Sequence, residues 1–143
     1  MGRTSLYFAA VLAGTIAAGM ATSQGLHAQD QQAQTPKEKI TPLLKTALAG
    51  MEGKEVSIVH ISAPPGFVTA KHFHPGEVFL YVLEGAITIE MDGDAPIKLG
   101  PGDVFQEQPG RSMVGRNLSS THGAKILVFQ IGDKGKPLTV KAE

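Results

Sequence analysis

From Val56 to Ile131 the chain repeats short stretches in which apolar and polar side chains alternate with a period of two. Turns rich in glycine, proline and aspartate separate these stretches at intervals of about 8–12 residues. Successive side chains of a strand point to opposite faces, so each such stretch can bury one face and expose the other. The pattern predicts an all-β domain, an antiparallel sandwich or barrel, with almost no helix.

Charge and composition exclude several classes of function. Thirteen Lys and Arg balance thirteen Asp and Glu, so no basic field favours nucleic acid. The chain has no cysteine, which excludes disulfides, iron–sulfur clusters, cysteine-based zinc sites and a thiol nucleophile. Ser112 has no adjacent base and acid arrangement, so nucleophilic hydrolysis is not expected. These exclusions limit the possible classes of function but do not identify an activity.

The first 28 residues are predicted to be an export signal. Arg3 supplies a positive charge, and residues 6–20 form an apolar stretch shorter than the roughly 20 residues of a membrane span. Cleavage is expected after Ala28 or after Ala21, and an uncleaved N-terminal anchor is the alternative. We therefore expect a periplasmic or secreted bacterial protein that does not associate with the membrane after cleavage.

The rest of the chain divides into a spacer and one domain. Residues 29–36 are polar and low in complexity, which predicts a flexible spacer. Residues 37–143 then form a single domain. Its first segment fits two structures: a short helix capped by Thr41 and begun by Pro42, or an extended arm. The continuous apolar run 78–83 predicts a strand that is buried on both faces.

His72 and His74 carry the main chemical signal. They lie two residues apart at a predicted strand, so both imidazoles project to the same face. Two neutral imidazoles and a nearby carboxylate form a ligand set for a divalent metal ion, and Glu77 follows three residues after His74. Two partly buried, hydrogen-bonded histidines are the alternative.

The residues around this pair resemble the first motif of the cupin family. Gly66 is followed, after five residues, by His72-Phe-His74-Pro-Gly-Glu77, and a hydrophobic strand then ends at Gly85. Further along, the second cupin motif is resembled by Gly100-Pro-Gly-Asp103, Gln108-Pro-Gly110 and Asn117. The segment Lys134-Gly-Lys-Pro-Leu138 resembles the C-terminal end of a group of small one-domain cupins. The resemblance covers about residues 54–140. It implies a cupin-like double-stranded β-helix, a jelly-roll barrel that is often a homodimer, with a ligand site inside.

Two positions depart from the family pattern. Counting back from Gly85 places Val78 where the family has its glutamate, and strand alternation then turns Glu77 to the other face unless a bulge corrects it. Counting along the second motif places Met113 at the usual third histidine. A thioether suits copper(I) and is a poor ligand for Mn²⁺, Fe²⁺ or Zn²⁺.

The ligand set that the resemblance implies is therefore His72, His74, Glu77 and Met113. With Glu77 it would be the facial triad of non-haem iron oxygenases, with Met113 it would suit copper, and a metal-free cavity is the third possibility. We expect an exported cupin-domain protein that binds a divalent metal ion (Fe, Mn, Zn or Cu) and acts on a small organic molecule as a dioxygenase- or isomerase-like oxidoreductase. The alternative is a non-catalytic barrel that binds a small ligand or copper.

Overall fold

The computed structural model describes residues 36–143. The predicted export signal, residues 1–28, and nearly all of the predicted spacer lie outside the described residues. Residues 36–143 fall within one compact unit and contain ten strands and no helix. Over that range, accordingly, there is no helix of the length and hydrophobicity that a membrane span requires.

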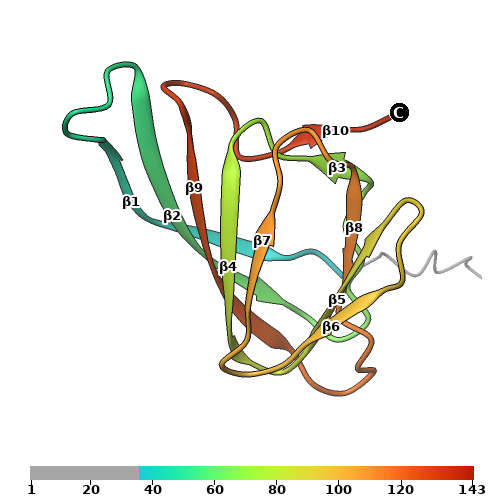
Figure 1. Ribbon diagram of the computed structural model, residues 1–143. Coiled ribbons are helices and arrows are strands. Elements are labelled where there is room, and N and C mark those ends of the chain that lie inside the picture. Colours follow the sequence, from blue (N-terminus) through green and yellow to red (C-terminus); the bar gives the residue numbers. More distant parts are fainter. Residues whose placement is uncertain (1–35) are drawn as a thin grey trace, which may run out of the picture. The chain divides into compact units, whose positions relative to one another are not determined.

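Two five-stranded antiparallel sheets form the domain (Figure 1). Sheet A has the order β1-β2-β9-β4-β7, with bounds Lys39–Ala47, Lys54–Ala63, Ala124–Asp133, Glu77–Glu84 and Val104–Glu107. Sheet B has the order β10-β3-β8-β5-β6, with bounds Val140–Lys141, His72–Phe73, Met113–Arg116, Ile87–Met91 and Ile97–Leu99. The predicted all-β architecture is confirmed.

Apolar side chains from the inner faces of both sheets form the core. In β9, Ala124, Ile126 and Val128 are buried while the residues between them are more exposed. Each fully buried side chain of the size of valine or leucine contributes about 1.5–3 kcal/mol. The buried cluster comprises Val59, Ala63, Phe67, Val78, Leu80, Val82, Ile87, Ile89, Met91, Leu99, Met113, Ala124, Ile126 and Val128.

The first segment of the domain is a strand, so the extended alternative is confirmed and the helix was wrong. β1 runs antiparallel along β2, with Thr41 opposite His60. The register shifts between Pro42 and Leu44. Proline cannot donate a hydrogen bond to a neighbouring strand, and an edge strand with an irregular register tolerates it. Pairing with β2 thus outweighs the local helix signal.

β4 alternates, although its run of apolar residues predicted burial on both faces. Val78, Leu80 and Val82 are buried, but Phe79, Tyr81 and Leu83 are 36%, 38% and 38% exposed on the outer face of sheet A. Sheet B covers only the inner face. Apolar residues therefore remain uncovered on the outer face of sheet A.

Asn117 joins the loops that connect strands near the end of β8. It is 2% exposed. Its Nδ2 donates to the carbonyl oxygens of Pro64 at 3.0 Å and His122 at 2.8 Å, and its Oδ1 accepts from the backbone N–H of Ser119 at 3.1 Å. The side chain supplies partners for backbone groups that the strand ladders do not reach.

Replacing Asn117 by alanine is expected to lower the free energy of unfolding by about 2 kcal/mol or more, because several backbone groups lose their partners. Urea unfolding followed by circular dichroism measures the change. Ser120→Ala, at an exposed position of the same loop, is the control and should stay within about 0.5 kcal/mol of wild type. An equal midpoint for the two variants would contradict this role of Asn117.

Candidate functional site

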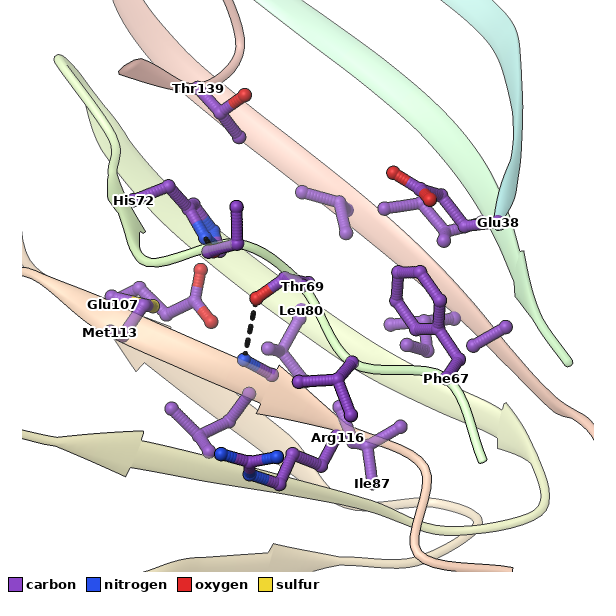
Figure 2. Close-up of a pocket in the computed structure, with 18 of the residues that line it drawn as sticks. Glu38, Phe67, Thr69, His72, Leu80, Ile87, Glu107, Met113, Arg116 and Thr139 are labelled. Carbon is purple, nitrogen blue, oxygen red and sulfur yellow. Dashed lines mark hydrogen bonds between the residues drawn. The ribbon is translucent and has the colours of Figure 1, made fainter. Parts of the chain in front are cut away.

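A cavity of about 350 Å³ lies between the two sheets (Figure 2). Most of its wall is apolar, with Phe67, Leu80, Ile87 and Val128 among the contributing side chains. Polar groups that line it include Thr69, His72, His74, Glu107, Arg116 and Thr139. Volumes and linings of this kind are typical of sites for small organic molecules.

The two histidines lie next to each other, as predicted. Their ring centroids are 5.1 Å apart and the ring planes are nearly perpendicular, at 83°. His72 comes from β3 of sheet B, and His74 follows directly after that strand. His74 is 5% exposed. Both rings line the cavity.

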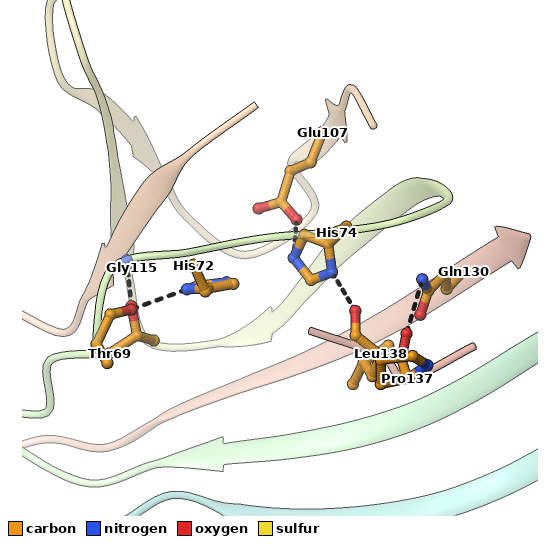
Figure 3. Close-up of polar contacts among 9 residues, drawn as sticks. Thr69, His72, His74, Glu107, Gly115, Gln130, Pro137 and Leu138 are labelled. Carbon is orange, nitrogen blue, oxygen red and sulfur yellow. Dashed lines mark hydrogen bonds and ion pairs between the residues drawn. The ribbon is translucent and has the colours of Figure 1, made fainter. Parts of the chain in front are cut away.

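Backbone carbonyls fix the orientation of both rings (Figure 3). His72 Nδ1 lies 2.9 Å from the carbonyl oxygen of Ala70, and His74 Nδ1 lies 2.7 Å from that of Leu138. A carbonyl oxygen only accepts, so Nδ1 carries the hydrogen in both rings. Nε2 is then the nitrogen that each ring offers to a ligand, an arrangement that metal-binding histidines commonly share.

A carboxylate that the sequence analysis did not identify meets His74. Glu107 Oε2 lies 3.1 Å from His74 Nε2, and both side chains are about 6% exposed. Glu107 ends β7 of sheet A, whereas His74 follows β3 of sheet B. The contact is a hydrogen bond when one of the two groups carries the proton, and it links the two sheets across the interior.

The structure does not bring Glu77 to the histidines, which corrects the predicted ligand set. Glu77 Oε2 accepts a hydrogen bond from Gln106 Nε2 at 3.0 Å, and its strand position lies opposite Ile131 on the outer face of sheet A. A bulge before Glu77 would be needed to turn it inward. The structure has no bulge there, because β4 pairs in regular register with β9 from Glu77 and with β7 from Val78, so Val78 faces inward and Glu77 outward.

Glu107 lies across from Val78, the position at which the family pattern has its glutamate. In the pairing of β4 with β7, Val78 lies directly opposite Glu107. Residues opposite each other in an antiparallel pair point to the same face. The carboxylate therefore enters the cavity from the neighbouring strand. The available sequence signal was the alternation of β7, in which Phe105 and Glu107 share a face.

Met113, at the position of the usual third histidine, is fully buried. It is 1% exposed, lines the cavity, and stands opposite His72 in the pairing of β3 with β8. Its side chain therefore lines the same cavity as His72 and Glu107 (Figure 2).

One pair of candidate donor atoms has the separation that two ligands of one metal ion would have. Two ligand atoms bound at about 2.0–2.2 Å to one ion lie roughly 3.0–3.4 Å apart, and His74 Nε2 and Glu107 Oε2 are 3.1 Å apart. Within residues 36–143, however, no three His, Cys, Asp or Glu side chains form a ready-made metal cluster. An ion at this place therefore requires His72 or Met113 to close in around the His74–Glu107 pair.

Comparison with known proteins identifies the barrel. A family model described as a cupin domain matches residues 59–129. A solved cupin-like protein from Thermotoga maritima is 18% identical, with a TM-score of 0.60, covering 73% of this chain and 75% of that one. An RmlC-like cupin with a double-stranded β-helix fold from Methanocaldococcus jannaschii is 20% identical, with a TM-score of 0.57 and coverages of 71% and 86%. These likenesses show the fold.

One solved structure has a named activity. DMSP lyase DddQ from Ruegeria pomeroyi is 26% identical, with a TM-score of 0.55, and the match covers 61% of this chain. The match spans only 43% of the lyase, less than half of its length. Comparison with the curated proteins gives no match.

Removing the carboxylate of Glu107 is expected to destabilise the protein far more than removing that of Glu77. Glu107→Ala leaves buried His74 without its Nε2 partner and should cost about 2 kcal/mol or more. Glu77→Ala removes an outer-face hydrogen bond and should cost about 0.5 kcal/mol or less. Urea midpoints of the two variants measure the difference, and equal losses would show that the His74–Glu107 contact has no special weight.

Proposed function

We propose that this chain, which belongs to the cupin family, binds a small organic molecule in its cavity and holds a divalent metal ion at the polar end. The observation that carries the proposal is the pair of imidazoles whose Nδ1–H groups are both fixed by backbone carbonyls. Such fixing leaves Nε2 of His72 and His74 as donors, and Glu107 adds a carboxylate beside them.

Each residue has a distinct task in this proposal. His72, His74 and Glu107 hold the ion, and Met113 stands behind them as a fourth donor. When bound, a divalent ion supplies Lewis acidity toward an oxygen of the organic molecule. The apolar wall excludes water from that molecule. Thr69 Oγ1 accepts the Gly115 N–H at 2.9 Å, so the Thr69 hydroxyl hydrogen is free to orient an acceptor.

The donor set narrows the metal and the reaction. Two imidazoles and a carboxylate suit Fe²⁺, Mn²⁺ or Zn²⁺, and the activity class proposed for such a centre is a dioxygenase- or isomerase-like oxidoreductase. Met113 and the direct His74–Glu107 contact favour a second candidate, a non-catalytic barrel that binds a small ligand or copper. We place either function outside the cytoplasm, on the strength of the leader-like first 28 residues.

Alanine at both His72 and His74 is expected to abolish metal uptake, measured by elemental analysis after incubation with Fe²⁺, Mn²⁺, Zn²⁺ or Cu⁺. The matched control is alanine at His60 and His122, which lie in β2 and in an exposed loop, away from the cavity lining. Equal metal content in the two double variants would dispose of the metal site. Uptake of Cu⁺ alone would favour the copper-binding candidate.

A second copy of the chain is the partner that we propose for the outer face of sheet A. Apolar side chains from neighbouring strands meet there across the ladders, among them Ile58, Phe79, Tyr81, Leu127 and Phe129. The five strands lie about 4.8 Å apart and four of them have eight to ten residues, so the face has an area on the order of 600 Å². That approaches the roughly 800 Å² per partner of a stable interface, and one apolar face can pack on its own copy about a twofold axis.

Lysine at Phe79 is expected to convert a dimer to a monomer, because it places a charge within the apolar face. Light scattering coupled to gel filtration measures the mass. Leu118→Lys is the control, since Leu118 is 69% exposed on a loop. A wild-type protein of monomeric mass would overturn the proposed dimer.

A further inference from the structure

The chain after β9 crosses from one sheet to the other. β9 ends at Asp133 in sheet A, and the chain rejoins sheet B as β10, which pairs with β3 (Figure 1). We call residues 134–142 the C-terminal strap. Its far end is fixed by the backbone N–H of Ala142, which donates to the carbonyl oxygen of Lys71 at 3.0 Å. Leu138, Thr139 and Lys141 of the strap line the cavity.

The strap contacts both histidines. The carbonyl oxygen of Leu138 accepts from His74 Nδ1 at 2.7 Å, and Lys141 stands opposite His72 in the pairing of β10 with β3. The strap thus holds one ring through a hydrogen bond and the other through the strand that carries it.

A buried glutamine anchors the strap where it passes His74. The inward positions of β9 are apolar until Gln130, which is 6% exposed. Its Nε2 lies 3.4 Å from the carbonyl oxygen of Pro137, the residue before Leu138 (Figure 3). Burying an amide is costly unless it finds a partner. This contact with the strap gives Gln130 one.

Charged groups anchor the beginning of the strap. Glu55 Oε1 accepts the backbone N–H of Gly135 at 3.0 Å and forms an ion pair with Lys45 at 2.9 Å. The hydrogen bond from Lys45 and that from Gly135 hold the pKa of Glu55 below its usual range. The strap is therefore tied down at its beginning, beside His74, and at its end.

We infer that the C-terminal strap is a positioning element of the site, in which Gln130 fixes residues 137–138 so that the Leu138 carbonyl sets the tautomer and ring angle of His74. The inference rests on the proposed function for its purpose. Its structural content is independent of any metal: the Leu138 carbonyl keeps a hydrogen on His74 Nδ1 while Nε2 faces Glu107, and without that acceptor only the Glu107 contact remains, which draws the hydrogen to Nε2. Gln130 and Leu138 act through His74 and are not catalytic residues.

Gln130→Met tests the anchor, because methionine keeps the length of glutamine and removes the amide donor. The readout is the tautomer of His74 in the metal-free, ¹⁵N-labelled protein, taken from long-range ¹H–¹⁵N NMR of the imidazole nitrogens and assigned with His74→Ala. We expect Nδ1 of wild-type His74 to carry a hydrogen, and Nδ1 of the variant to lose it in part of the population. The matched control is Gln106→Met, which makes the same change on the outer face of sheet A.

Two further measurements make the result decisive. A chain that ends at Gly135 lacks the Leu138 carbonyl and β10. The imidazole nitrogen signals of His74 should therefore change more in this chain than in Gln130→Met. Zn²⁺ affinity of Gln130→Met, by isothermal titration, should fall about tenfold, as expected when a group that orients a metal-binding histidine is lost.

Each failure points to a different conclusion. The inference is overturned if the hydrogen of wild-type His74 is averaged between the two ring nitrogens. It is also overturned if the imidazole spectrum of His74 is unchanged in both Gln130→Met and the shortened chain, even if the protein binds Zn²⁺. The wild-type spectrum decides the point even where a variant fails to fold. If the wild-type protein binds no metal but shows the expected His74 spectrum, the metal site is overturned. The strap then remains the element that positions His74.

Discussion

The barrel interior depends on a single buried imidazole with three attachments. His74 belongs to the sheet B side of the molecule, its Nε2 meets Glu107 of sheet A, and its Nδ1 donates to the carbonyl of Leu138. Polar groups inside an apolar barrel destabilise it unless each finds a partner, and among the described residues no buried side-chain nitrogen or oxygen lacks one. The contact that places a carboxylate beside His74 in the cavity also links the two sheets.

Strand alternation allowed the fold to be predicted, because inward and outward residues differ in polarity over most of the chain. It was misleading where both faces are apolar, as around Tyr81, since sequence cannot show which surface a neighbouring sheet covers. The pair of histidines was predictable because it depends on local spacing alone. Glu107 was not, because its approach to His74 depends on how β4 and β7 are registered. Glu77 faces outward for a similarly non-local reason, the register of β4 on β9, in which Glu77 lies opposite Ile131.

β4 belongs to two surfaces with different properties. Val78, Leu80 and Val82 face the interior near the candidate site, and the aromatic residues between them form part of the outer apolar face. A strand in the middle of a sheet cannot tilt without moving both faces. The backbone of β4 therefore connects the outer apolar face with the wall of the cavity.

The pairing of Val78 with Glu107 has a consequence for how such centres change over time. Two positions opposite each other in a ladder aim side chains into the same space, so an acidic group can be gained on one strand before it is lost from the other. The cavity then keeps a carboxyl group at every intermediate. Descendants of one ancestral barrel can for this reason carry equivalent carboxylates at positions that never align, and sequence comparison alone scores such a centre as lost when it has only moved sideways.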